Sequence, residues 1–205
     1  MIIGFAGRAR HGKDHCASHA QKLLREKAVT RGFAQSLKER VARALPEFRH
    51  KVYEKPKWMR DILQATGNGV READEEFWVR DLFKWYENFG GSFFGGHINT
   101  RHLLVPDVRY PNEVEAIKAR GGKVIKVVRM DKPPHDPQLC IDEVGFCVYQ
   151  TTKYLAPGVN HAHPSESTID TLPDETFDAI IIAETGMLGY LEQMVEDNLR
   201  AWGLL

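Results

Sequence analysis

The sequence predicts an α/β protein in which helices cover both faces of a mostly parallel sheet. Short, continuous apolar runs alternate along the 205 residues with longer stretches of helical periodicity. Apolar runs of about four to eight residues are typical of strands that are buried on both faces. Strands that alternate with helices form parallel sheets through crossover connections. The length suits one such domain, residues 1–205, with a small lid insertion.

The individual elements follow from the periodicity of each segment. The expected strands are residues 2–6, 29–34, 102–108, 123–129 and 179–183, of which 29–34 is weak. The expected helices are residues 13–27, 36–45, 58–65, 74–89, 111–120 and 187–202. Gly67 and Gly69 are expected to end the third helix, and Asn112 with Glu115 to form a capping box at the start of the fifth. Residues 130–167 are rich in Pro, His and Cys, have no helical period and are the candidate lid.

The composition favours binding of a small anion over binding of a nucleic acid polymer. Lysine plus arginine equals aspartate plus glutamate, at 28 each, whereas nucleic-acid binders usually have a basic excess. Three cysteines and no signal-peptide pattern indicate reduced thiols and a cytoplasmic protein. No apolar run reaches the ~18 residues that span a membrane, so we expect no membrane partner. The oligomeric state stays open, a homodimer included.

The segment after the first strand matches the phosphate-binding pattern G-x-x-x-x-G-K. It reads Gly7-Arg8-Ala9-Arg10-His11-Gly12-Lys13, between a buried strand and an amphipathic helix. Glycines let backbone N–H groups point at phosphate oxygens, and a helix N-terminus adds about half a positive charge. Lys13 would bridge the β- and γ-phosphates. These features predict a three-layer P-loop NTP hydrolase/kinase fold that binds ATP.

Asp14 stands where this pattern usually has Ser or Thr. A carboxylate beside a triphosphate is repulsive unless a cation lies between them. We therefore interpret Asp14 as a Mg²⁺ partner that acts through water. The alternative is a glycine-rich turn whose first-turn Asp stabilises the helix.

A second acid, Asp107, ends the apolar run of residues 103–107. A carboxylate at that place can hold a metal ion or an attacking water, and Arg109 would lie at the same rim of the sheet. The alternative is that Asp107 caps a turn and pairs with Arg109. These residues alone leave the two interpretations open.

Further segments follow in order along the chain. They are Phe33-Ala34 with Leu37-Lys38; Arg60, Leu63-Gln64 and Gly67, then Arg71 and Trp78-Val79; Asp107-Val108-Arg109-Tyr110-Pro111-Asn112-Glu113, then Gly121-Gly122 and a strand to Arg129; His163-Pro164-Ser165-Glu166; and Phe177-Asp178. Together with the G-x-x-x-x-G-K-D loop, they resemble the bacteriophage-type deoxynucleoside monophosphate kinase family. Its corresponding motifs include F-A-x-x-L-K, R-x-x-L-Q-x-x-G with W-V, and H-x-S-E, and the likeness covers most of the chain.

The resemblance implies an enzyme of deoxynucleotide metabolism that uses ATP and Mg²⁺ to phosphorylate a deoxynucleoside 5′-monophosphate (dNMP), in the host cytoplasm if phage-encoded. Residues 35–90 would form a helical acceptor-binding region. The expected ATP-binding residues are Gly7, Arg8, Ala9, Arg10, His11, Gly12, Lys13, Asp14 and His15. The expected dNMP-binding residues are Phe33, Lys38, Arg60, Gln64, Arg71, Trp78, His163 and Glu166. The expected catalytic residues are Lys13, Asp14, Asp107, Arg109 and Arg129, with Asp14 and Asp107 on Mg²⁺.

Two features depart from the family pattern and keep other hypotheses in view. His15 replaces a Thr, and residues 183–186 lack the Asn often found after the last strand. The competing hypotheses are a dephospho-coenzyme-A-kinase-like enzyme and a nucleotide-binding module without catalysis. A separate hypothesis is a Zn²⁺ site, although its C-x₆-C and H-x-H spacing matches no tight zinc knuckle. Its four residues are Cys140, Cys147, His161 and His163.

Overall fold

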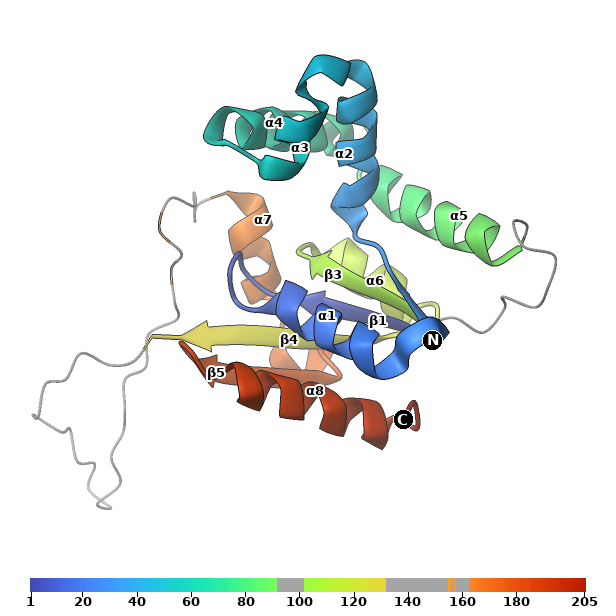
Figure 1. Ribbon diagram of the computed structural model, residues 1–205, viewed down its shortest axis with the longest axis vertical. Coiled ribbons are helices and arrows are strands. Elements are labelled where there is room, and N and C mark those ends of the chain that lie inside the picture. Colours follow the sequence, from blue (N-terminus) through green and yellow to red (C-terminus); the bar gives the residue numbers. More distant parts are fainter. Residues whose placement is uncertain (92–101, 132–154, 156, 158–162) are drawn as a thin grey trace, which may run out of the picture.

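The computed structural model describes residues 1–91, 102–131, 155, 157 and 163–205 (Figure 1). These residues form a five-stranded sheet, in the order β2-β3-β1-β4-β5, whose ladders are all parallel. The strands are β1 (Ile2–Ala6), β2 (Ala28–Thr30), β3 (His102–Val108), β4 (Lys123–Met130) and β5 (Ala179–Glu184). The helices are α1 (Lys13–Leu24), α2 (Phe33–Ala44), α3 (Arg49–Glu54), α4 (Lys57–Ala73), α5 (Phe77–Gly91), α6 (Pro111–Lys118), α7 (Pro164–Ser167) and α8 (Leu188–Ala201). Short 3₁₀ turns are η1 (Arg25–Lys27), η2 (Pro46–Phe48), η3 (Thr168–Thr171) and η4 (Asp174–Thr176).

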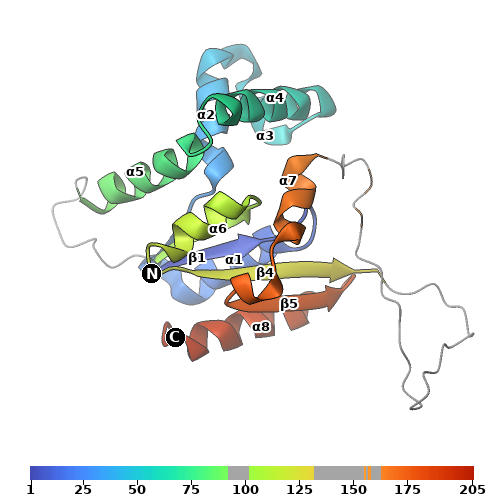
Figure 2. The ribbon, with the colours of Figure 1, turned by 180° about the vertical axis from the view of Figure 1, so that it is seen from behind.

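Helices cover both faces of the sheet, because successive strand residues point to opposite sides. In β1, Ile3 and Phe5 pack against α1 and α8, whereas Ile2 and Ala6 pack in the cluster that contains α5 and α6. Figure 1 shows α1 and α8 on the near face, and Figure 2 shows α6 on the other. The predicted α/β class with a mostly parallel sheet is confirmed, and the layering is compatible with a three-layer fold.

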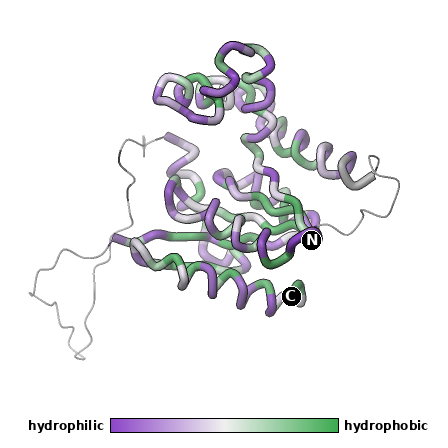
Figure 3. The backbone as a smooth tube through the Cα atoms, in the orientation of Figure 1, coloured by the Kyte–Doolittle hydropathy of each residue, from purple (hydrophilic) through white to green (hydrophobic). Residues whose placement is uncertain are grey.

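A helical lobe, defined here as α2–α4, stands above the sheet in Figure 1. It has a small core of its own, completed by Trp78 from α5. The buried members of this core are Leu37, Val41, Ala42, Val52, Met59, Leu63 and Trp78. In Figure 3 the strands are largely hydrophobic, whereas the lobe alternates between hydrophilic and hydrophobic residues. The lobe, residues 33–73, begins two residues before the segment 35–90 that the resemblance implies to be helical, and α5 occupies most of the rest of that segment.

The glycines of α4 do not end the helix as predicted, since α4 continues through Gly67 and Gly69 to Ala73. At Gly67 the neighbouring elements come close. A Cβ there would lie 3.2 Å from Leu37 Cδ2, and the Trp78 indole N–H donates to the Gly67 carbonyl at 3.2 Å. Gly67 therefore allows close packing inside the helix instead of stopping it.

Other boundaries also differ from the prediction. Residues 49–54, for which no helix was expected, form α3. The expected strand at residues 29–34 is observed only as β2 (Ala28–Thr30), because α2 already begins at Phe33, three residues before its expected start. The capping pair of α6 is Tyr110 and Glu113, not Asn112 and Glu115, because Pro111 is already the first helical residue.

The candidate lid is described only at its ends. Residues 130–131, 155, 157 and 163–167 are described, and the last of these ranges contains α7. Cys140, Cys147 and His161 lie outside the described residues. No helix within the described ranges has the length and apolar character needed to cross a membrane.

Candidate functional site

The β1–α1 loop (residues 7–12) turns sharply against β4. Gly7 and Gly12 have φ values of 140° and 98°, which L side chains rarely adopt. A Cβ on Gly7 would lie 2.4 Å from the carbonyl oxygen of Val127. The backbone therefore requires glycine at both positions. The loop leads directly into α1 and lies between the ends of β3 and β4, the edge at which parallel sheets bind ligands.

Lys13, the first residue of α1, points back into this loop. It is 4% exposed, and its Nζ donates to the Arg8 carbonyl at 2.6 Å. Burial is the main cause that lowers the pKa of Lys13 to about 7. The charge of Arg109 acts in the same direction, and the charges of Asp14 and Asp107 oppose it. An anion bound in the loop would favour the charged form of this amine.

Arg129, near the end of β4, connects the loop to the segment that follows the edge strand β5. Its guanidinium donates to the Arg10 carbonyl (3.3 Å) and to Thr185 Oγ1 (2.9 Å). Its backbone N–H donates to Nδ1 of the buried His11 (3.3 Å). Arg129, one of the expected catalytic residues, thus holds the loop and the segment after β5 together in this structure.

A carboxylate already lies against the loop. Oε2 of Glu166, in α7, accepts the N–H of Ala9 at 2.6 Å, and Oε1 pairs with the guanidinium of Arg109. Nearby, Arg8 pairs with Asp170 of η3 at 2.5 Å. Glu166 is 3% exposed, so its charge depends on these partners. An anion therefore fits between a loop amide and Arg109.

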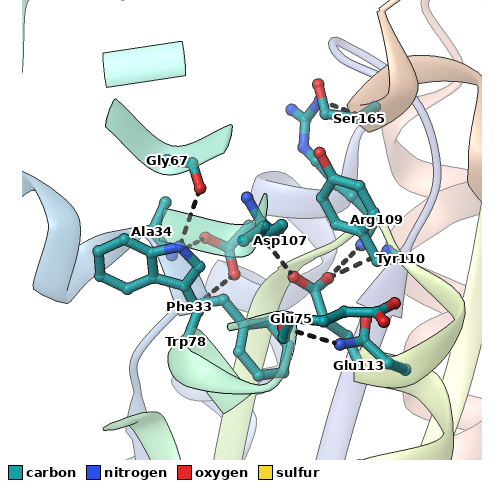
Figure 4. Close-up of polar contacts among 12 residues, drawn as sticks. Phe33, Ala34, Gly67, Glu75, Trp78, Asp107, Arg109, Tyr110, Glu113 and Ser165 are labelled. Atoms are coloured by element: carbon teal, nitrogen blue, oxygen red, sulfur yellow. Dashed lines mark hydrogen bonds and ion pairs between the residues drawn. The ribbon is translucent and has the colours of Figure 1, made fainter. Parts of the chain in front are cut away.

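Asp107, at the end of β3, accepts two backbone N–H groups at the start of α2 (Figure 4). The donors are Phe33 at 2.8 Å and Ala34 at 3.0 Å. A Cβ on Gly32 would lie 2.4 Å from this carboxylate. Asp107 thus caps α2, as one of the two alternatives held. The pairing with Arg109 in that alternative is wrong, because Arg109 pairs with Glu166.

Glu113 and Arg71 connect the lobe to the rim of the sheet. The Glu113 carboxylate accepts the backbone N–H groups of Arg109 and Tyr110 (Figure 4). It also pairs with Arg71 of α4 at 3.2 Å. Burial raises the pKa of Glu113 to about 7, and the charge of Arg71 opposes this rise.

Lys55, which the sequence did not single out, adds a cation to this site. It ends α3 at the surface with a left-handed backbone, φ 55°. Partial burial lowers the pKa of Lys55, as do the charges of Lys38 and Arg109, while Asp14 and Asp107 oppose this. Its charge therefore lies within electrostatic reach of Asp14, Asp107 and Arg109, which also act on Lys13. Sequence reasoning missed Lys55 because no helix was expected at residues 49–54, and a lysine before a proline is no signal of a binding site.

The other expected acceptor residues of the lobe divide into core and surface. Phe33 (2% exposed) and Trp78 (3% exposed) belong to hydrophobic clusters, so they support the lobe by packing. Arg60 is exposed and donates to the Lys55 carbonyl at 2.8 Å, and Gln64 is also exposed.

His163 links α7 to the lobe. Its Nδ1 accepts the Ser165 N–H at 3.2 Å and so caps α7, while its Nε2 lies 2.9 Å from the amide nitrogen of Asn68 in α4. Burial lowers the pKa of His163, and the charges of Arg109 and Arg71 add to this. The His163 side chain therefore contacts both α7 and the lobe.

Asp14 and His15, in the first turn of α1, face different surroundings. Asp14 is exposed and lies within electrostatic reach of Lys13 and Lys55. His15 Nε2 lies 3.1 Å from Glu192 of α8, so this side chain contacts α8. No group of three or more His, Cys, Asp or Glu side chains suited to a metal ion occurs in the described part of the chain. A Mg²⁺ ion here would depend on Asp14, Asp107, water and a ligand, a donor set that suits Mg²⁺.

Comparison with known proteins finds a distant relative. No protein-family model matches the chain. The chain is 30% identical over 130 residues to the uncharacterized protein ORF77 of Ictalurid herpesvirus 1 (strain Auburn). The match covers 62% of this chain and 50% of that protein, so the chain spans about half the length of this curated relative.

Proposed function

We propose that this protein is a P-loop kinase that transfers the γ-phosphate of ATP to a dNMP. The observation that carries the proposal is the buried Lys13 inside a G-x-x-x-x-G-K-D loop, within electrostatic reach of Arg109 and Asp107. The ordered resemblance to phage-type dNMP kinases supports the choice of acceptor.

The loop would bind the triphosphate. Its N–H groups and the N-terminus of α1 offer partial positive charge, and Lys13 adds a full charge once an anion restores its proton. The Ala9 N–H, now bonded to Glu166, would turn to a phosphate oxygen when that carboxylate is displaced. When bound, Mg²⁺ would neutralise phosphate charge, held through water by Asp14 and Asp107.

The acceptor would bind between the loop and the lobe. Arg109, Arg71 and Lys55 would supply the positive charge, from the β3–α6 segment, from α4 and from the residue after α3. Arginine forks bind phosphate through two parallel hydrogen bonds. An anionic acceptor with one phosphate matches this set.

Phosphoryl transfer requires the side chains mainly to position the substrates and to neutralise charge. An acceptor phosphate has its second pKa near ~6 and is ionised at pH 7, so no general base is required. One of its oxygens bonds to the γ-phosphorus, and the bond from that phosphorus to the β-phosphate oxygen breaks, which leaves ADP. Lys13 and Arg109 would stabilise the charge on the oxygens of the transferred group.

A coupled ADP-release assay with dAMP, dGMP, dCMP and dTMP tests the proposal. We expect turnover with at least one of them that requires Mg²⁺. Turnover with dephospho-coenzyme A alone would assign the other kinase class. Tight ATP binding by calorimetry, without transfer to any acceptor, would assign a nucleotide-binding module.

A further inference from the structure

Glu113 occupies a buried position where the lobe meets the rim of the sheet. It is 2% exposed, and both carboxylate oxygens have partners. Oε2 accepts the backbone N–H groups of Arg109 (2.7 Å) and Tyr110 (3.2 Å), and Oε1 accepts from Arg71 Nη2 (3.2 Å). A helix cap needs only the first oxygen. The other oxygen, Oε1, bonds to Arg71 from α4, and capping does not explain this contact.

Arg71 is held in one orientation by an aromatic ring against its guanidinium and a carboxylate at its edge. Its guanidinium lies 4.1 Å from the centre of the Tyr110 ring, and one edge bonds to Glu113. Because the guanidinium is a rigid fork of five donors, holding one edge also orients the others. Its side chain is 23% exposed, so water or a ligand reaches part of it.

Arg71 and Arg109 converge although they come from different elements. The charges of both act on the same two groups, the Tyr110 hydroxyl and the His163 imidazole. Glu113 touches both residues, Arg71 through its side chain and Arg109 through its backbone. Glu113 therefore holds the Arg71 guanidinium, whereas the Arg109 guanidinium is held by Glu166 and the Ser165 carbonyl.

We propose that Glu113 is a positioning residue that orients Arg71, so that Arg71 and Arg109 form a two-arginine clamp for the 5′-phosphate of the acceptor. The proposal rests on the proposed function, since it assigns the clamp to the dNMP. Arg71 belongs to the lobe, so the Arg71–Glu113 pair also sets where the lobe stands over the rim. Substrate phosphate would bind the outer edges of the two guanidinium groups, while Glu113 keeps the inner edge of Arg71.

The substitution Glu113→Gln separates this role from capping. The glutamine carbonyl can still accept the N–H groups of Arg109 and Tyr110, but its NH₂ group cannot accept from Arg71. We expect the KM for the dNMP to rise about tenfold, since hydrogen bonds to charged groups are worth roughly that factor. The KM for ATP, kcat and the melting temperature at pH 7 should change little. Glu115→Gln, an exposed change two residues along α6, is the matched control and should leave all four values unchanged.

A readout that needs no catalysis accompanies the kinetics. Calorimetric titration with each dNMP, and with orthophosphate, should show the same weakening in Glu113→Gln. The Arg71 Nε–H resonance should be sharp and protected in the wild type and broadened in the variant. Glu113→Asp, which keeps the charge, should recover part of the affinity.

The outcomes divide cleanly. Equal loss of ATP affinity, dNMP affinity and melting temperature in Glu113→Gln would mean a structural role and overturn the proposal, as would unchanged dNMP affinity. A wild type that binds dNMPs without transferring phosphate would refute the kinase function, while the affinity comparison would still decide the role of Glu113. A wild type that binds neither dNMPs nor orthophosphate would overturn both.

Discussion

The sheet side and the lobe side of the candidate site hold their cations differently. On the sheet side, Lys13 is 4% exposed and bonded to a loop carbonyl, and Arg109 is paired with Glu166. On the lobe side, Lys55 and Arg60 are exposed at the surface. The sheet side is therefore preformed by backbone constraints and buried contacts, whereas the lobe side offers charges that water still reaches. Preformed charge is worth more to an anion, because less reorganisation accompanies binding.

The largest effect should come from the preformed side. Lys13→Met removes a buried cation without adding volume to the loop. We expect kcat to fall about a thousandfold, the scale of removing a preorganised charge donor from a transition state. The coupled assay measures this, and circular dichroism checks that the fold persists. Lys22→Met, an exposed change on the same helix, is the control. Activity within tenfold of the wild type in Lys13→Met would show that the sheet side is not the reaction centre.

Glu113, where the sheet side and the lobe side meet, should make the stability of the protein depend on pH. The folded pKa of Glu113 is raised by burial to about 7 from 4.5. A carboxyl with a raised folded pKa favours folding below its unfolded pKa, and this contribution is lost as pH rises through the folded pKa. The unfolding free energy of the wild type, measured against Glu113→Gln, should therefore fall by roughly 3 kcal/mol between pH 4 and pH 8. Urea titrations across this range measure it, and a difference that does not change with pH would contradict the buried charge.

The difference between the sheet side and the lobe side also explains which features could be predicted from the sequence. The loop was predictable because Gly7 and Gly12 follow a fixed pattern that the backbone itself requires. Strands β1, β3 and β4 were predictable because their apolar runs are largely buried, as is typical of strands covered on both faces. Lys55 and the second contact of Glu113 were not, because each depends on how a lobe helix sits against the sheet. The prediction that α4 ends at Gly67 failed for a related reason, because contacts with Leu37 and Trp78 override the tendency of glycine to end a helix.

A smaller effect should come from the carboxylate that now occupies the loop. Glu166→Gln removes the charge that pairs with Arg109, while the glutamine oxygen can still accept the Ala9 N–H. If Glu166 competes with phosphate oxygens for these donors, the variant should bind ATP about tenfold more tightly. Calorimetry with ATP and Mg²⁺ measures this. Glu175→Gln in η4, which is exposed, is the control. Weaker dNMP binding with unchanged ATP affinity would instead make Glu166 an acceptor contact, as the family resemblance implies.

The smallest effect should come from the exposed side. Lys55→Met removes a cation that acts through solvent, and exposed charges contribute about 0.2–1 kcal/mol. We expect the KM for the dNMP to rise roughly threefold at low salt, with kcat unchanged. The difference should fade near ~1 M salt, where the screening length is only about 3 Å. Lys57→Met is the matched control, because the Lys57 side chain is 90% exposed and pairs with Asp61 within the lobe. A loss that persists at high salt would show that Lys55 becomes buried against the ligand. The lobe would then close over the acceptor, and the contrast between the two sides would belong to the unliganded protein alone.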